Sequence, residues 1–123
     1  MATTQDGGRL TTHVLDIVHG RPGAGVTVEL FRLDGAQRTH LKTARTNQDG
    51  RCDAPLLAGT ELTAGSYELV FHVAAYFAAA GVAVGERPFL DAVPIRFGVA
   101  AAGQHYHVPL VVSPWAYSTY RGS

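Results

Sequence analysis

The sequence contains only one cysteine, Cys52, in 123 residues. A single thiol cannot form an intrachain disulfide, and it excludes a zinc site built mainly from cysteines. The sequence also has no excess charge of either sign, because ten Lys and Arg side chains offset ten Asp and Glu side chains. Nucleic acids and anionic membranes bind proteins that concentrate positive charge. We therefore expect neither nucleic acid nor a membrane as a partner.

Long apolar segments are missing as well. A mostly apolar stretch without fully charged side chains, residues 69–85, contains His72, Tyr76 and many Ala and Gly residues. It falls short of the roughly 18 strongly apolar residues of a membrane-spanning helix. The N-terminus has neither the basic start nor the apolar run of a signal peptide. These features predict a cytoplasmic protein with a flexible N-terminal segment, residues 1–9, before one domain over residues 10–123.

What the sequence does contain is a composition typical of a folded protein, with 46% hydrophobic and 16% charged residues. Short alternating segments are separated by turn-forming residues, which is typical of strands. The expected strands are 10–18, 26–33, 39–46, a short one at 51–56, 65–74, 89–97, 104–112 and 116–121, with a short helix at 76–80. This spacing predicts an all-β protein, an antiparallel β-sandwich of seven to eight strands with one short helix.

Two expected strands could bury side chains on both of their faces. In strand 10–18, one face carries Thr12, Val14, Asp16 and Val18, and the other carries His13, Leu15 and Ile17. In strand 104–112 and its end, one face carries Tyr106, Val108, Leu110 and Val112, and the other carries His105, His107, Pro109, Val111 and Ser113. A two-layer sandwich requires only one apolar face on each strand. The second face is compatible with contact to another subunit, and the pattern leaves the oligomeric state open.

Six histidines are the residues most able to carry chemistry. His105 and His107 form a His-x-His pair that zinc sites also use, with His13 as a conceivable third ligand. No nearby Cys, Asp or Glu completes a ligand set, so paired histidines without a metal are favoured. His19 and His40 are expected to be solvated surface residues. His72 is expected to face solvent or to pack at an edge.

Common catalytic motifs do not occur in the sequence. There is no Gly-x-Ser-x-Gly, no Gly-x-Gly-x-x-Gly and no Walker-type loop. Cys52 beside Arg51 could be an activated thiol, although a packing role is favoured. Arg51 follows a turn at Asp49-Gly50 and by itself reads as a surface arginine. The residue types alone therefore indicate a β-sandwich with suggestive histidines, without defining a reaction.

Three motifs in order resemble the transthyretin family over most of the chain, from residue 10 to residue 123. The first consists of His13-Val14-Leu15-Asp16, Gly20-Arg21-Pro22-Gly23 and Val26-Thr27-Val28. The second runs from Tyr106-His107-Val108-Pro109-Leu110 through Val111-Val112-Ser113-Pro114-Trp115 to Ala116-Tyr117-Ser118-Thr119. The third is the terminal Tyr120-Arg121-Gly122-Ser123, which resembles the branch of the family that hydrolyses 5-hydroxyisourate rather than the hormone carriers.

The resemblance implies a homotetramer of β-sandwiches with active sites at the subunit interface, in a central channel. In the hormone carriers the positions of His13, Arg51 and His107 hold lysine, glutamate and threonine, so this chain has the enzyme's residue at all three. The implied catalytic residues are His13, Arg51, His107 and Ser123. The implied substrate-binding residues are His13, Arg51, Tyr120, Arg121 and Gly122. The C-terminal strand would place Ser118, Tyr120 and Gly122 on the channel side. No metal and no cofactor are implied.

The reaction implied by the resemblance is the hydrolysis of 5-hydroxyisourate to 2-oxo-4-hydroxy-4-carboxy-5-ureidoimidazoline, in which water opens the six-membered ring at C6. A neutral imidazole suits activation of that water, and a nearby Arg51 would disfavour the protonated histidines. Arg51 could also anchor the anionic substrate. Tyr120 would close the pocket, and Ser123 with a terminal carboxylate would position the histidine or the water. Whether His13 or His107 removes the proton stays open.

Two other functions are compatible with the same fold. One is a carrier that binds an apolar or iodinated aromatic ligand in the channel. The other is a structural accessory sandwich, which predicts a monomer. Neither requires His13, Arg51 and His107 at the positions of the family's enzymes, so the hydrolase is favoured.

Overall fold

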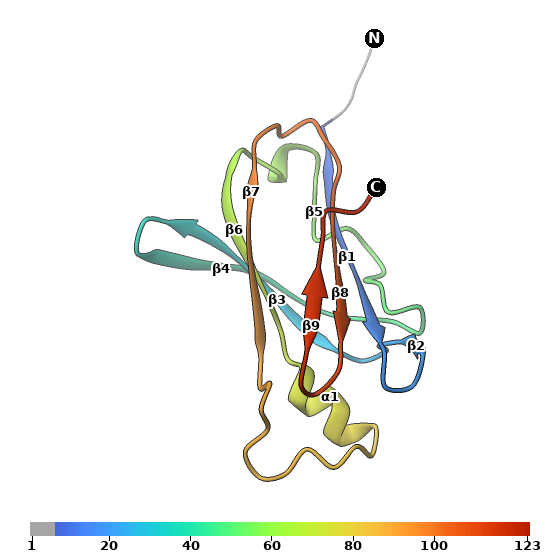
Figure 1. Ribbon diagram of the computed structural model, residues 1–123. Helices are drawn as coiled ribbons and strands as arrows, with labels where there is room; N and C mark the ends of the chain where they lie inside the picture. Colours follow the sequence, from blue (N-terminus) through green and yellow to red (C-terminus); the bar gives the residue numbers. More distant parts are fainter. Residues whose placement is uncertain (1–6) are drawn as a thin grey trace.

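The computed structural model describes residues 7–123, which form two facing sheets (Figure 1). The first sheet has the order β2 (Arg21–Pro22), β1 (Arg9–Asp16), β8 (Tyr106–Val112) and β9 (Tyr117–Thr119), and β5 (Leu57–Ala58) also pairs with β1. The second sheet has the order β4 (Gln37–Arg45), β3 (Thr27–Asp34), β6 (Gly65–Phe71) and β7 (Val93–Val99). The described residues also contain one helix, α1 (Val73–Ala79), and one turn of 3-10 helix at Gly59–Glu61.

The predicted β-sandwich with one short helix is confirmed. Nine strands occur in the described part of the chain, two of them only two residues long. One pairing differs from the expected antiparallel pattern, because β1 and β8 run parallel, with Leu10 opposite Tyr106 and Asp16 opposite Val112. These two strands lie about ninety residues apart in sequence, and no short turn constrains their relative direction.

The core lies between the sheets and follows the alternation expected for β1 and β8. Leu10, Val14, Leu110 and Val112 are fully buried. They meet buried residues of the second sheet, Val28, Leu30, Leu69 and Phe71, together with Phe77 of α1. The opposite face of the first sheet carries His13, Leu15, His107 and Val111, which are only partly buried. That outer face is therefore the part of the sandwich available to a substrate or a partner.

Some expected boundaries were wrong. The first strand ends at Asp16 and not at Val18, because the Asp16 carboxylate accepts the backbone N–H groups of Val18 (2.9 Å) and His19 (3.0 Å) and turns the chain. Val18 therefore does not continue the buried face and is exposed. No strand forms over 51–56, where Arg51 makes only an isolated bridge with His13.

The helix also begins earlier than expected, at Val73 and not at Tyr76. The pairing of β6 with β3 ends at Phe71 opposite Val28, and the alanine-rich chain beyond it takes up helix. The strand expected over 89–97 begins at Val93 and continues to Val99. Of the N-terminal segment expected over 1–9, residues 1–6 lie outside the described residues, and Arg9 already belongs to β1; its flexibility stays a prediction.

No helix among residues 7–123 has the length and apolar character needed to cross a membrane.

Candidate active site

The parallel pairing of β1 with β8 brings two of the predicted residues together on the outer face of the first sheet. Thr11 lies opposite His107, and His13 lies opposite Pro109. Residues opposite one another or two apart on adjacent strands share a face. The rings of His13 and His107 are accordingly close, with their centroids 6.5 Å apart. Two imidazoles from distant parts of the sequence thus form one cluster.

A tight turn places Arg51 beside this cluster. Asn47 Oδ1 accepts the backbone N–H groups of Asp49 (2.9 Å) and Arg51 (3.2 Å), and Gly50 adopts a positive φ of 74°. The N–H of Val14 donates to the Gly50 carbonyl at 2.8 Å. A Cβ atom at Gly50 would lie only 2.4 Å from the Val14 carbonyl oxygen, so the close approach requires glycine. Arg51 follows directly and pairs with His13.

The C-terminal residues cover the other side of His107. The Gly122 N–H donates to the His107 carbonyl at 2.8 Å, and the two residues form an isolated antiparallel bridge. A Cβ atom at Gly122 would lie 2.6 Å from Cδ2 of His107, so the imidazole packs directly on the glycine backbone. Ser118 lies opposite Val111, on the same outer face of the sheet.

Arg51 and His107 line an open pocket of about 360 Å³, whereas His13 and Gly122 lie beside His107 without lining it. Its polar lining comes mainly from Arg9, Thr11, Arg51, His105, His107 and Ser123. The pocket is therefore basic, with donors suited to an anionic or oxygen-rich ligand.

Both clustered histidines have lowered pKa values. Burial lowers the pKa of His13 from its ordinary 6.5, the Arg51 guanidinium lowers it further, and Asp49 opposes these effects. Burial also lowers the pKa of His107, and the positive charges of Arg51, His13 and His105 act in the same direction. The two imidazoles are therefore neutral near pH 7, the state in which a histidine can accept a proton from water.

Of the predicted site residues, Arg51, His107 and Ser123 line this pocket, His13 and Gly122 lie beside His107, and Tyr120 and Arg121 lie elsewhere in the chain. Tyr120 has 60% of its surface exposed and adjoins a separate groove near Phe97 and Thr119. The Arg121 guanidinium lies 4.0 Å from the centroid of the Tyr106 ring and donates to the His105 carbonyl at 3.1 Å. Arg121 therefore holds the C-terminal residues against β8 and the turn before it.

Sequence reasoning gave Thr11 no role, and it considered His105 only as a possible zinc ligand next to His107. The Thr11 hydroxyl lies 2.8 Å from Nδ1 of His107 and 3.0 Å from Nε2 of His105. The strand alternation could have indicated that these residues share a face with the predicted site. Thr11 precedes His13 by two residues, and His105 precedes His107 by two. What the alternation could not show is that β1 and β8 are neighbours.

Cys52 also contributes to the pocket lining but is not an activated thiol. The side chain packs against the core, and burial, followed by the nearby Asp53 charge, raises the pKa of the thiol. A protonated thiol is a weak nucleophile and a weak metal ligand. Among residues 7–123, no three or more His, Cys, Asp or Glu side chains are grouped so that they could hold a metal ion.

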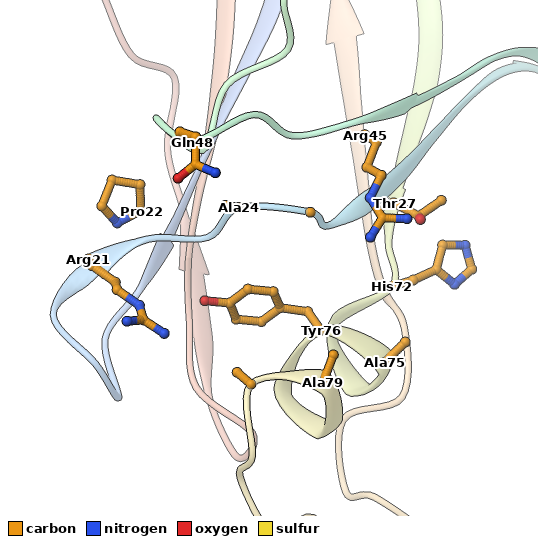
Figure 2. Close-up of a pocket in the computed structure, with 12 residues that line it drawn as sticks. Arg21, Pro22, Ala24, Thr27, Arg45, Gln48, His72, Ala75, Tyr76 and Ala79 are labelled. Atoms are coloured by element: carbon orange, nitrogen blue, oxygen red, sulfur yellow. The ribbon is translucent and has the colours of Figure 1, made fainter.

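A larger pocket, of about 480 Å³, lies between the turn around β2, the end of β4 and α1 (Figure 2). Two of its titratable side chains, Tyr76 and His72, are already engaged within the fold. The Tyr76 hydroxyl donates to buried Asp16 at 2.6 Å, and burial together with Asp16 raises the pKa of Tyr76 to about 12. His72 is hydrogen-bonded to Glu29 at 2.8 Å. The smaller pocket on the outer sheet face is therefore the better candidate for catalysis.

Fold and site together define a β-sandwich protein with a histidine–arginine pocket on the outer face of one sheet. Residues 10–122 match the model of the HIUase/Transthyretin family, and the chain belongs to that family. The family expected from the three sequence motifs is thereby confirmed.

Two curated relatives carry the same name. The chain is 64% identical to a 5-hydroxyisourate hydrolase of Mesorhizobium japonicum, over 96% of this chain and 94% of the relative. It is 60% identical to a 5-hydroxyisourate hydrolase of Ralstonia nicotianae, over 94% of this chain and 99% of the relative.

Solved structures show the same fold. The 5-hydroxyisourate hydrolase of Klebsiella pneumoniae matches with a TM-score of 0.78 and 38% identity, over 94% of this chain and 99% of that one. Sea bream transthyretin in complex with thyroxine matches with a TM-score of 0.83 and 26% identity, over 93% and 94% of the two chains. An (S)-allantoin synthase matches with a TM-score of 0.91 and 44% identity, and this chain spans only 46% of its length.

Proposed function

We propose that this protein is an enzyme that hydrolyses 5-hydroxyisourate to 2-oxo-4-hydroxy-4-carboxy-5-ureidoimidazoline, within the breakdown of urate. The observation that carries the proposal is a pocket lined by Arg51 and His107, with His13 beside both of them and the pKa values of both histidines lowered. Relatives of 60% identity and more that carry the name of this hydrolase support the same reaction.

The chemistry follows from the charge of the pocket. A neutral His107 or His13 accepts a proton from water as the oxygen attacks the C6 carbonyl. The ring C–N bond then breaks, and its nitrogen takes that proton from the imidazolium, which restores the neutral histidine. The planar guanidinium of Arg51 binds the polar edge of the substrate and stabilises the negative charge that develops on the carbonyl oxygen. Ser123, which lines the pocket, positions the water or the imidazole.

The homotetramer with active sites at the subunit interface is part of this proposal. Large apolar side chains are exposed at the turns that border the first sheet, with Ile17 55% and Trp115 62% exposed. Exposed apolar surface of this kind marks an interaction surface. Tyr120 and Arg121, which one chain holds away from its own pocket, would contact substrate only in such an assembly. The cytoplasmic location stays a prediction.

The direct test follows the ultraviolet absorbance of 5-hydroxyisourate that is generated in the cuvette from urate and urate oxidase. We expect the protein to accelerate the decay, and Arg51→Glu to abolish the acceleration. Arg87→Glu, an exposed position in the loop before β7, is the matched control and is expected to retain activity. A folded wild-type protein that leaves the decay unchanged would refute the proposal and favour a carrier.

A further inference from the structure

One hydroxyl group lies between two imidazoles at the edge of the pocket. Thr11 Oγ1 is 2.8 Å from Nδ1 of His107 and 3.0 Å from Nε2 of His105. A hydroxyl group has a single proton, so it can donate to only one of the two nitrogens, and at least one of them must donate to it. The protonated nitrogen of His107 is therefore coupled to that of His105 through Thr11.

The backbone holds the three side chains in this arrangement. Thr11 lies opposite His107 in the parallel pairing of β1 and β8, and His105 precedes His107 by two residues. Gly122 closes the other side of the His107 ring, where a Cβ atom would already be 2.6 Å from Cδ2. With Nδ1 of His107 engaged by Thr11, Nε2 is the ring nitrogen left for the substrate or its water.

The charges around His107 indicate whether the Thr11 hydroxyl donates to His105 or to His107. The charged and titratable groups around His107 are His13 and Arg9 on β1, Arg51 in the turn, and His105 before β8. Arg51 and Arg9 line the same pocket as His107, and Arg51 pairs with His13 beside the His107 ring. Because Nδ1 is engaged by Thr11, Nε2 is the nitrogen left for this basic pocket, and nearby cations favour a lone pair there over an N–H group.

We propose that Thr11 and His105 are positioning residues that hold His107 as the tautomer with a proton on Nδ1 and a lone pair on Nε2. The chain runs from His107 Nδ1–H to Thr11 Oγ1, and from the Thr11 hydroxyl hydrogen to His105 Nε2. The inference rests on the proposed hydrolase function, for which it names His107 Nε2 as the atom that receives the proton from water. Thr11 and His105 act only through His107.

The first test observes the tautomer without substrate. Protein labelled with ¹⁵N in its histidines is examined by NMR near neutral pH, and the His107 signals are assigned by their loss in His107→Gln. We expect a protonated Nδ1 and an unprotonated Nε2 in the wild type and in Thr11→Ser. In Thr11→Val, which keeps the shape and loses the hydroxyl, we expect the tautomer with a proton on Nε2 to gain population. A wild type that already carries the proton on Nε2, or a Thr11→Val spectrum identical to it, overturns the proposal.

The second test measures kinetics. We expect Thr11→Val to lower kcat at least about tenfold, a part of the roughly 10²–10⁴-fold that a positioned base supplies, with KM changed less than about twofold. Thr11→Ser is expected to restore most of kcat, and His105→Phe to resemble Thr11→Val. The matched control is Thr43→Val, which removes a Thr–His hydrogen bond of 2.8 Å to His40 on the exposed strand β4.

The two tests separate this inference from the proposed function. A protein without hydrolase activity refutes the function, while the NMR spectra still decide the tautomer of His107. An active protein in which Thr11→Val keeps full kcat refutes the positioning role, whatever the tautomer.

Discussion

At the scale of single residues, two glycines allow the close backbone approaches that place Arg51 and His107 at the pocket. Gly50 lets the turn approach the Val14 carbonyl so that Arg51 reaches His13, and Gly122 lets the His107 ring pack on the backbone. Neither position tolerates even one extra carbon without displacing a neighbour. The two glycines therefore determine where the candidate catalytic side chains lie.

We expect Gly122→Ala to lower kcat/KM about tenfold or more, because its Cβ would displace the His107 ring from its position in the pocket. The apparent Tm should change little, because Gly122 lies at the end of the chain. Gly103→Ala is the control, since a Cβ there has open space. Steady-state kinetics of both variants test the prediction, and an unchanged kcat/KM for Gly122→Ala would contradict it.

The lowered pKa values of His13 and His107 predict the direction of the pH dependence. Burial and Arg51 both disfavour the charged imidazoles. The acid limb of the kcat/KM profile should therefore lie below the ordinary histidine pKa of 6.5, and activity should be lost as pH falls through it. In Arg51→Gln, NMR titration should show both pKa values rising toward 6.5. A pKa for His107 that falls in this variant would contradict the argument.

At the scale of elements, buried Asp16 joins the end of β1 to the following turn and to α1. Its carboxylate accepts the Tyr76 hydroxyl at 2.6 Å and lies 2.6 Å from Nδ1 of His19, in addition to the two backbone N–H groups of the turn. His19 was expected to be a solvated surface residue, and it is exposed, although its ring also pairs with Asp16. The contacts fix the strand that carries His13.

We expect Asp16→Asn to lower the free energy of unfolding by about 2–3 kcal/mol, because an amide cannot replace all the hydrogen bonds that the buried carboxylate accepts. Tyr76→Phe should cost about 1–2 kcal/mol, since it leaves one acceptor unfilled. Urea unfolding near pH 7 measures both. Asp34→Asn at the exposed end of β3 is the control and should have little effect.

The same carboxylate predicts how stability depends on pH. Burial alone would raise the pKa of Asp16, but the hydrogen bonds from Tyr76 and His19 outweigh burial and lower it below the ordinary 3.8. A lowered folded-state pKa contributes stability that is fully present above 3.8 and is lost as pH falls through the folded value. When the pH is lowered below about 4, the urea concentration at the unfolding midpoint of the wild type should therefore decrease. The midpoint of Asp16→Asn should decrease less.

At the scale of the whole molecule, the outer face of the first sheet determines how the pocket meets its surroundings. The pocket opens on this face, and Val111 lies farther along β8 on the same side. If a second copy covers the face, a charge at Val111 would be buried against it at a large cost. The assembly state and the activity should then change together.

We expect the wild type to sediment as a tetramer and Val111→Glu to sediment as a smaller species with lower hydrolase activity. Thr39→Glu on the exposed strand β4 is the control and should leave both unchanged. Analytical ultracentrifugation and the decay of 5-hydroxyisourate absorbance test the pair. A fully active wild-type monomer would contradict the assembly at the interface.

The sequence by itself determined which residues alternate and which motifs they form. The period of two along β1 and β8 separated the buried face from the face with His13 and His107, because successive side chains of a strand point to opposite sides. The resemblance to the family added Arg51 and the C-terminal residues, whose roles no local pattern reveals. The sandwich and its helix followed from the same alternation and from the alanine-rich segment.

Only the tertiary structure decided which strands are neighbours. The parallel pairing of β1 with β8 joins segments about ninety residues apart, and it alone brings Thr11 between His105 and His107. Likewise, the fold turns Arg121 onto Tyr106 and links Asp16 to Tyr76 across sixty positions. Local propensity acts over a few residues, whereas these contacts depend on how the whole core packs, so no local pattern could predict them.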